Sequence, residues 1–179
     1  MFDPARAAET AMIAQRYFGS AAPPERIGWG ISGYVYVSPE LPTVVKIHHH
    51  QEFFARELEV YQRLSTLRLT SIIGLNVPRL IDHRPSLRLI EIELVDAPYL
   101  LDFAGVEYTP PEIAWEPDRV AQWHEEIGYR FGPNAHIAYA AHHALTRYGM
   151  YYMDLRPSNV NLTGFPGVEA DPPSEFEDL

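Results

Sequence analysis

Residues 25–47 read ERIGWGISGYVYVSPELPTVVKI, three runs of strand-forming residues separated by turn residues. The runs are Glu25–Trp29, Gly33–Val37 and Thr43–Ile47, and a proline-containing loop joins the last two. β-Branched and aromatic residues favour strands, whereas Gly and Pro favour turns. This stretch predicts a three-stranded antiparallel meander.

Along the sequence, one helix is predicted before the meander and another after it. The segment Pro4–Phe18 begins after Asp3, a residue typical of a helix N-terminus, and carries apolar residues at helical spacing. The segment Gln51–Leu67 has one apolar face, formed by Phe54, Leu58, Tyr61, Leu64 and Leu67. The order strand, strand, strand, helix indicates a small sheet with a helix packed on it.

The rest of the chain adds two strands and then becomes mainly helical. Strands are predicted at Pro78–His83 and Leu87–Leu94, and helices at Asp118–Phe131 and Asn134–Tyr148, the second capped by Asn134 and stopped by Gly149. Within 151–170, a loop and two short strands around Thr163 to Gly167 are expected, before an acidic tail. We therefore expect an α+β fold, with a β-rich part at 1–95 and a helical part at 96–179.

The turn between the first two strands is rich in glycine. Gly28, Gly30, Gly33 and Val35 match the pattern G-x-G-x-x-G-x-V between two strands, a context different from the strand-to-helix turn of dinucleotide-binding folds. Glycines let a backbone pass close to phosphates, and a valine can press on a purine. A glycine-rich hairpin that binds nothing fits the same residues.

The third strand contains Lys46, the single lysine among 14 basic residues. An ammonium group within an apolar strand needs an anionic partner. Glu57, 11 residues later on the predicted helix, is the candidate, and Glu59 is its competitor. The alternative is a surface lysine near an unrelated exposed glutamate.

The segment Tyr152 to Val160 reads YMDLRPSNV, with Asp154 and Asn159 five positions apart around a proline. It resembles the catalytic loop of protein kinases, H-R-D-L-x-x-x-N, with Tyr152 and Met153 in place of His and Arg. The resemblance implies that Asp154 is the catalytic base and that Asn159 is a metal ligand. A turn residue without a catalytic role is the alternative for Asp154.

The resemblance covers about residues 26–171 and implies a protein-kinase-like fold, with a β-rich N-lobe and a truncated, mainly helical C-lobe. It implies ATP with Mg²⁺, or Mn²⁺, as cofactors. Lys46 and Glu57 then position the phosphates. Asp171, from an incomplete D-F-G motif, is a second metal ligand on a hairpin with Asn159, or else a residue of the tail. From the order of the motifs, the resemblance implies that the backbone at Glu93 and Val95 contacts adenine. It also makes Asp96 or Asp102 a candidate to reach a ribose, and the alternative for either is a solvated loop acid.

Three functions are consistent with this resemblance. The first is a phosphotransferase that passes the γ-phosphate of ATP to an unidentified hydroxyl acceptor. The second is a pseudokinase-like module that binds a nucleotide or a protein, because the D-F-G glycine and an activation segment are absent. The third is a small-molecule kinase of the aminoglycoside or choline type. The truncated C-lobe also predicts an exposed apolar surface for a protein partner or for self-association.

The composition narrows the remaining classes. A net charge of −10 with scattered arginines disfavours nucleic acid, and the sequence has no cysteine for thiol chemistry or disulfides. No apolar run is long enough for a membrane helix, and the N-terminal residues lack the pattern of a secretory signal. We expect a cytoplasmic protein with no membrane association.

Several conspicuous side chains are assigned structural roles. His48, His49 and His50 are expected in a solvated loop, since neighbours on a strand point to opposite sides and cannot converge on a metal. His142 and His143 are expected to pack or to face solvent. The aromatic residues of the second half are expected to be packed inside the protein: Trp115, Trp123, Tyr129 and Phe131.

Overall fold

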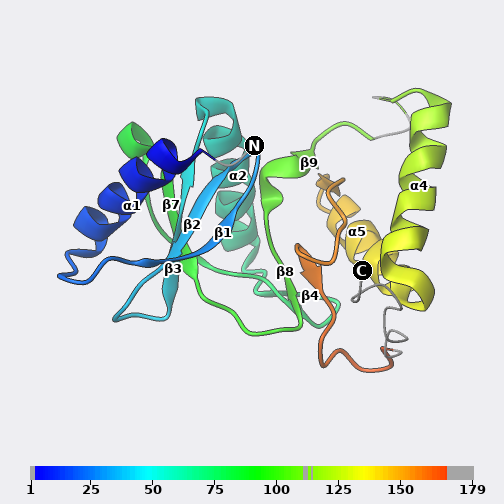
Figure 1. The fold of residues 1–179 in the computed structure, drawn as a ribbon. Helices are drawn as coiled ribbons and strands as arrows, with labels where there is room; N and C mark the ends of the chain where they lie inside the picture. Colours follow the sequence, from blue (N-terminus) through cyan, green and yellow to red (C-terminus); the bar gives the residue numbers. More distant parts are fainter. Residues whose placement is uncertain (1–2, 111–112, 114, 169–179) are drawn as a thin grey trace, which may run out of the picture. The chain divides into compact units, whose positions relative to one another are not determined.

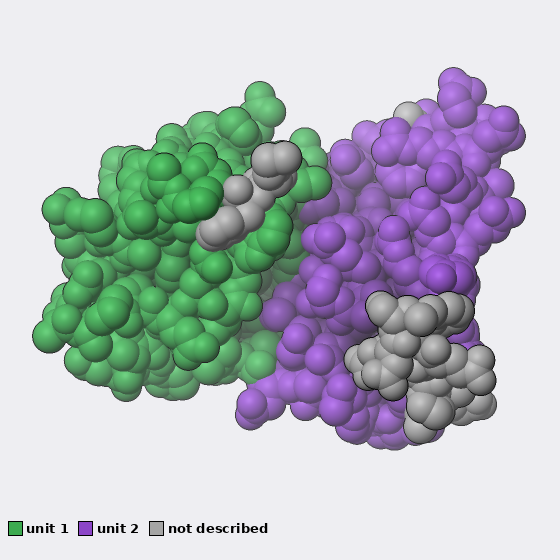
Figure 2. Space-filling model, viewed as in Figure 1, with its two compact units in different colours: residues 1–70, 77–95, 102–104 green, residues 71–76, 96–101, 105–179 purple. Residues whose placement is uncertain are grey.

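The computed structural model describes residues 3–110, 113 and 115–168, and these fall into two compact units (Figure 1). Unit 1 comprises residues 1–70, 77–95 and 102–104, and unit 2 comprises 71–76, 96–101 and 105–179 (Figure 2). The chain passes from one unit to the other at several points, and one of them lies at the expected boundary, residue 95. The short segments 71–76 and 102–104, however, belong to the unit opposite to the one in which that boundary puts them.

Unit 1 is built on a five-stranded antiparallel sheet in the order β1-β2-β3-β7-β6. The meander predicted from residues 25–47 is present. A register shift between Arg26 and Gly28 places a bulge at Ile27 in the edge strand. The elements of this unit are α1 (Pro4–Phe18), β1 (Glu25–Trp29), β2 (Gly33–Val37), β3 (Thr43–His48), α2 (Gln51–Leu67), β6 (Leu80–Arg84), a 3-10 turn (Pro85–Leu87) and β7 (Leu89–Glu93).

One face of this sheet is covered by α1. The Asp3 carboxylate caps the helix by accepting hydrogen bonds from the amides of Ala5 and Arg6, at 3.0 and 3.1 Å. Side chains from β2, β3 and β7 pack with the apolar face of the helix, and the buried members of this cluster are Ala7, Ala14, Tyr34, Tyr36, Val45, Ile47 and Leu89. Two helices therefore pack on the sheet, where the sequence predicted one.

The other face carries α2. Its buried residues follow the helical repeat and include Phe54, Glu57, Tyr61 and Leu64. Leu67, which was expected on this face, is exposed at the end of the helix. Side chains alternate along a strand, and Val45 and Ile47 of β3 point toward α1. The residues of β3 that alternate with these two therefore point to the opposite face, toward α2. The apolar stripe of α2 therefore brings a carboxylate to that face of β3.

Unit 2 combines two helices with short strand pairs. Its elements are β4 (Ser71–Ile72), β5 (Leu75–Asn76), β8 (Tyr99–Leu100), β9 (Val106–Glu107), α4 (Pro117–Phe131), a 3-10 turn (Gly132–Asn134), α5 (Ala135–Thr146), β10 (Tyr151–Tyr152) and β11 (Val160–Asn161). The strand β10 pairs with β9, and β11 lies beside β8 in a small sheet of order β11-β8-β5-β4. A 3-10 turn at Phe103–Gly105 spans a crossing between units.

The helices of unit 2 differ from the prediction at three points. Asn134 is buried at the start of α5, but its side chain makes no capping hydrogen bond, and the helix ends at Thr146, before Gly149. Tyr129 is 92% exposed, so the expectation that it is packed inside the protein is wrong. The residues Trp123, Ile127 and Phe131 are buried at a spacing of four, which leaves Tyr129 on the opposite side of α4.

The chain is an α+β protein with a small antiparallel sheet, as predicted. Within the described ranges, no helix has both the length and the apolar character needed to cross a bilayer.

The docking of α1 can be tested at Tyr36. Its buried hydroxyl donates to the carbonyl of Ala7 and lies 2.8 Å from the hydroxyl of Thr10. We expect Tyr36→Phe to lower the free energy of unfolding by about 1–3 kcal/mol, because these buried groups lose a partner. Urea denaturation followed by circular dichroism measures this change. The matched control, Tyr129→Phe, removes an exposed hydroxyl and should have no measurable effect; equal stability of the two variants would contradict this account of the docking.

Candidate functional site

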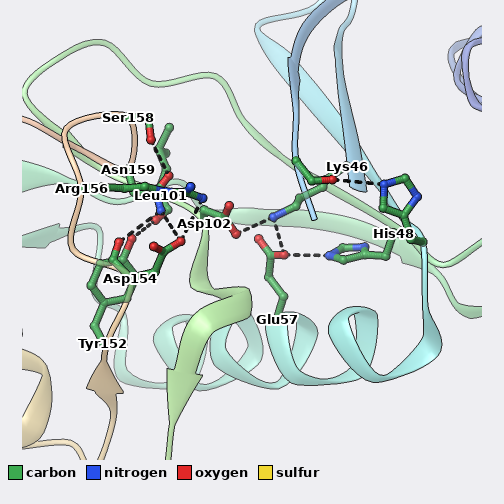
Figure 3. Close-up of polar contacts among 12 residues, drawn as sticks. Lys46, His48, Glu57, Leu101, Asp102, Tyr152, Asp154, Arg156, Ser158 and Asn159 are labelled. Carbon is green, nitrogen blue, oxygen red and sulfur yellow. Dashed lines mark hydrogen bonds and ion pairs between the residues drawn. The ribbon is translucent and has the colours of Figure 1, made fainter. Parts of the chain in front are cut away.

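The candidate site of unit 1 is centred on Lys46, which is 6% exposed in β3. Its Nζ lies 2.8 Å from Oε2 of Glu57 and 2.6 Å from Oδ1 of Asp102 (Figure 3). The ion pair with Glu57 is the one predicted from the sequence, and the competing Glu59 is exposed. Lys46 projects from the α2 face of the sheet because Val45 and Ile47, its neighbours, pack with α1.

The two anions keep the ammonium charged in spite of its burial. Burial by itself lowers the pKa of Lys46, but Glu57 and Asp102 outweigh burial and raise it above its ordinary value. For Glu57, burial favours the neutral acid, whereas the charge of Lys46 and the hydrogen bond from His48 lower its pKa to about 2. Both groups are therefore ionised at neutral pH.

Asp102 reaches Lys46 from the short segment 102–104 that belongs to unit 1. The segment is held by Phe103, a fully buried side chain whose ring packs edge-on against Tyr61 of α2 at 5.3 Å. Asp102 has a φ of 56°, in the left-handed region that aspartate tolerates better than most residues. Its side chain is 26% exposed, whereas that of Glu57 is 1% exposed.

His48 is also part of this site, so the expectation that it lies in a solvated loop is wrong. It is the last residue of β3 and is completely buried. Nε2 of its ring lies 2.7 Å from Oε2 of Glu57 (Figure 3). Nδ1 lies 3.0 Å from the carbonyl oxygen of Arg88. Lys46 and His48, two residues apart on one face of β3, thus contact the same carboxylate oxygen.

The glycine turn is tied to the end of the same strand by His49. Its Nε2 donates to the carbonyl of Gly30 at 3.1 Å, and its amide donates to the carbonyl of Ser32 at 3.0 Å. Within the turn, the amide of Gly30 donates to the carbonyl of Gly33. The half-buried Val35 pairs with Lys46 across β2 and β3, and therefore lies on the same face of the sheet. Two adjacent histidines therefore hold this part of unit 1: His49 bonds to the glycine turn, and His48 bonds to the ion-pair cluster.

The glycines of the turn have different surroundings. A Cβ on Gly33 would lie 2.3 Å from the carbonyl oxygen of Ile47, so this glycine is required by the packing of β2 on β3. A Cβ on Gly28 would make ordinary contacts with Val35. A Cβ on Gly30 would meet nothing within 4 Å. Packing therefore explains Gly33, and Gly30 is the glycine beside which the described residues leave room.

The second candidate cluster lies in unit 2, on the segment that follows β10. Asn159, which is 4% exposed, donates from Nδ2 to Oδ2 of Asp154 at 2.8 Å and also contacts the carbonyl oxygen of Asp154 (Figure 3). Arg156 forms an ion pair with the same carboxylate at 2.9 Å. The hydrogen bond between the side chains of Asn159 and Asp154, five positions apart, thus closes the loop between them. The hydroxyl of Ser158 lies 3.3 Å from Oδ1 of Asn159.

The backbone of this loop is fixed from several elements of unit 2. From α4, the indole of Trp123 donates to the carbonyl of Met153 at 2.9 Å, and from α5, the ring of His142 donates to the carbonyl of Tyr152 at 2.9 Å. The carbonyl of Asn159 accepts from the amide of Leu101 at 2.8 Å, next to the β8–β11 pair. His142 is therefore packed, one of the two outcomes expected for it. These hydrogen bonds anchor the backbone of the loop to the rest of unit 2. Asp154, at the start of the loop, is half-buried.

The remaining predicted site residues are placed as follows. Asp171 lies outside the described residues. Asn161 and Val160 pair with β8, and no second strand follows them up to residue 168, so the hairpin expected to join Asn159 and Asp171 is absent from the described part. The amide of Glu93 donates to the carbonyl of Arg79, and its carboxylate receives two hydrogen bonds from the Arg79 guanidinium, which lower its pKa. That amide is thus engaged within unit 1; Val95 follows in the same unit and is half-buried.

The sequence reasoning missed the role of two residues. His48 could have been found by extending the strand pattern by one residue, since alternation places it on the same face as Lys46. Asp102 was considered only as a contact for ribose or as a solvated loop acid. It is 56 residues from Lys46, and no local pattern signals that the chain returns to unit 1 there.

The contrast between two glycines gives a test of the turn. We expect Gly33→Ala to lower the free energy of unfolding by about 1–3 kcal/mol, because the added carbon overlaps the backbone of β3. Gly30→Ala is the matched control and should change stability by less than about 1 kcal/mol. Urea denaturation of both variants measures the difference, and an equal loss in both would contradict the assigned packing.

The charge of Glu57 gives a pH test. Its folded pKa of about 2 lies below the ordinary value of 4.5, so its stabilising effect is complete above about pH 4.5 and is lost as the pH falls toward 2. Between pH 5 and pH 3 the wild type should lose about 1–2 kcal/mol more stability than Glu57→Gln. Urea titrations at each pH measure this. Glu59→Gln, an exposed neighbour on α2, should follow the wild type; a Glu57→Gln profile parallel to that of the wild type would disprove the assignment.

Comparisons of the chain with protein-family models, with curated proteins and with solved structures found no match. The resemblance to protein kinases therefore rests on the residues themselves. Those residues form two polar clusters, one around Lys46 in unit 1 and one around Asp154 in unit 2.

Proposed function

We propose that this protein is an ATP- and Mg²⁺-dependent phosphotransferase with a protein-kinase-like fold, which passes the γ-phosphate to an unidentified hydroxyl acceptor. The observation that carries the proposal is the buried Lys46, held by Glu57 on the face of the sheet that also carries Val35. A lysine buried with an ionised carboxylate is a costly arrangement for stability alone. Binding of an anionic ligand by the ammonium group is a function that accounts for such a lysine.

In unit 1, the proposal assigns the nucleotide phosphates to Lys46 and to the backbone of the glycine turn. The ammonium supplies a fixed positive charge, and the space beside Gly30 allows a close approach of the backbone to a phosphate. Glu57 keeps the ammonium in place from α2. Val35 offers an apolar contact to the base, and the backbone at Glu93 and Val95 remains the proposed contact for its edge.

In unit 2, the proposal assigns the chemical step to the Asp154 loop. Asp154 is half-buried and accepts a hydrogen bond from Asn159, which orients its carboxylate. A carboxylate held in this way can accept the proton of an attacking hydroxyl. Asn159 and Asp171 are the proposed oxygen ligands of Mg²⁺, which would supply positive charge to the phosphates.

A nucleotide-binding module without transferase activity is the second candidate. It is favoured by the contacts of unit 2, where one oxygen of Asp154 serves both Asn159 and Arg156, and where Oδ1 of Asn159 lies next to the Ser158 hydroxyl. In this case the nucleotide would bind through Lys46 without transfer.

Thermal melting with and without Mg²⁺-ATP tests the binding step. At free ATP about 100-fold above Kd, binding stabilises the folded form by about 2.7 kcal/mol and should raise Tm by roughly 5–10 °C. We expect Lys46→Met to abolish this rise. Arg147→Ala, which removes an exposed cation directly after the end of α5 in unit 2, should retain it. No rise at millimolar Mg²⁺-ATP in the wild type would refute both candidate functions.

The transfer step is tested separately with Asp154→Asn. This variant should keep the rise in Tm but should lose ATP-dependent phosphate release by at least about 100-fold, the size of a general-base contribution. Wild-type protein that binds Mg²⁺-ATP but releases phosphate no faster than Asp154→Asn would support the binding module over the transferase.

A further inference from the structure

The hydrogen bonds of His48 define its protonation state. The carbonyl oxygen of Arg88 can only accept, so Nδ1 must carry a proton. The partner of Nε2 is Oε2 of Glu57, a carboxylate oxygen that also pairs with the ammonium of Lys46 at 2.8 Å and can only accept, so Nε2 must carry a proton as well. Either neutral form of the ring would leave one nitrogen facing an acceptor in a completely buried position. The geometry therefore requires a doubly protonated, positively charged ring.

This charge changes the balance around Lys46. Glu57 then faces two cations, Lys46 and His48, both of which contact its Oε2. One carboxylate cannot neutralise two positive charges, so the buried trio carries a net charge of +1. Asp102, 2.6 Å from the ammonium, adds a second negative charge beside Lys46. Without the charge of His48, Glu57 alone would neutralise Lys46.

The two anions of the site are not equivalent. Glu57 lies on the buried stripe of α2 and contacts both cations, whereas the Asp102 side chain is 26% exposed and comes from a three-residue segment. Breaking a buried pair is far more costly than exchanging the partner of a solvent-accessible carboxylate. Asp102 is thus the anion that another anion can replace at Lys46.

We infer that His48 is a positioning residue whose positive charge makes the Lys46 site an anion-binding site, and that Asp102 occupies this site until a phosphate group of a ligand replaces it. His48 acts through Glu57. The positive charge of His48 offsets the negative charge of Glu57, which would otherwise neutralise Lys46. This inference rests on the proposed function, since it explains how the ammonium can bind a nucleotide phosphate although it is already paired.

The groups that face His48 are consistent with a fixed charge. On α2 these are Glu57 and the ring of Phe54, which packs edge-on at 5.8 Å. On β3 the charged neighbour is Lys46, and His49 is the residue directly after His48 in the sequence. From the turn before β7, Arg88 offers its carbonyl to Nδ1, and its own Nε donates to the carbonyl of His48 at 3.2 Å. With Asp102 included, two carboxylates lie among these cations.

Nitrogen NMR of the ligand-free protein tests the charge of His48. In protein labelled with ¹⁵N-histidine, both ring nitrogens of His48 should resonate as protonated nitrogens at neutral pH, with two exchange-protected ring protons. The signal is assigned by its loss in His48→Gln and its retention in His50→Gln, which changes an exposed neighbour. A spectrum with one unprotonated ring nitrogen would overturn the inference.

Binding of inorganic tripolyphosphate, measured by calorimetry without metal, tests the replacement of Asp102. Asp102→Asn should bind at least about tenfold more tightly than the wild type, because a charge-assisted contact no longer competes. Asp118→Asn makes the same charge change at an exposed position in the first turn of α4 and should bind like the wild type. His48→Gln should bind at least about tenfold more weakly. Weaker or unchanged binding by Asp102→Asn would overturn the inference.

The outcomes separate this inference from the proposed function. If His48 is charged and Asp102→Asn strengthens tripolyphosphate binding, but Mg²⁺-ATP does not raise Tm, the anion site stands and the nucleotide function fails. If Mg²⁺-ATP raises Tm but His48 is neutral, the nucleotide function stands and the inference fails.

Discussion

A single ammonium group within a strand determines much of how unit 1 is built. Lys46 is 6% exposed, and leaving it unpaired there would require several kcal/mol. The requirement is met from two directions, by Glu57 on α2 and by Asp102 on the returning segment 102–104. The registers of α2 and of that segment relative to β3 are therefore fixed by charge as well as by apolar packing.

The same strand separates two kinds of interior. On the α1 side, β3 presents Val45 and Ile47 to an apolar cluster in which the hydroxyls of Tyr34 and Tyr36 bond to the backbone of α1. On the α2 side it presents Lys46 and His48 to a charged cluster. Alternation of side chains along an extended strand is sufficient to produce this division. A shift of β3 by one residue would exchange the two sets and bury both cations in the apolar cluster.

Much of this arrangement could be predicted from the sequence, and the exceptions have physical reasons. Glu57 was identified because it shares a helical face with Tyr61 and Leu64, and a helical repeat is visible locally. The strands of unit 2 are two residues long, too short to show a periodicity, and β8, β9, β10 and β11 pair with distant segments. Asp102 depends on a return of the chain after 56 residues, which local patterns do not encode. Tyr129 could have been placed correctly from the spacing of Trp123, Ile127 and Phe131.

The burial of Lys46 has a consequence for covalent labelling of the protein. It is the only lysine of the 179-residue sequence, and every other basic side chain is an arginine or a histidine. Reagents that acylate amines therefore have one side-chain target, which is distinguished from the α-amine by peptide mapping, and its nitrogen is held between two carboxylates in the folded chain. Acylation of this ε-amine requires the pairs with Glu57 and Asp102 to open. The rate of acylation thus reports on the opening of one ion-pair cluster, without any introduced probe.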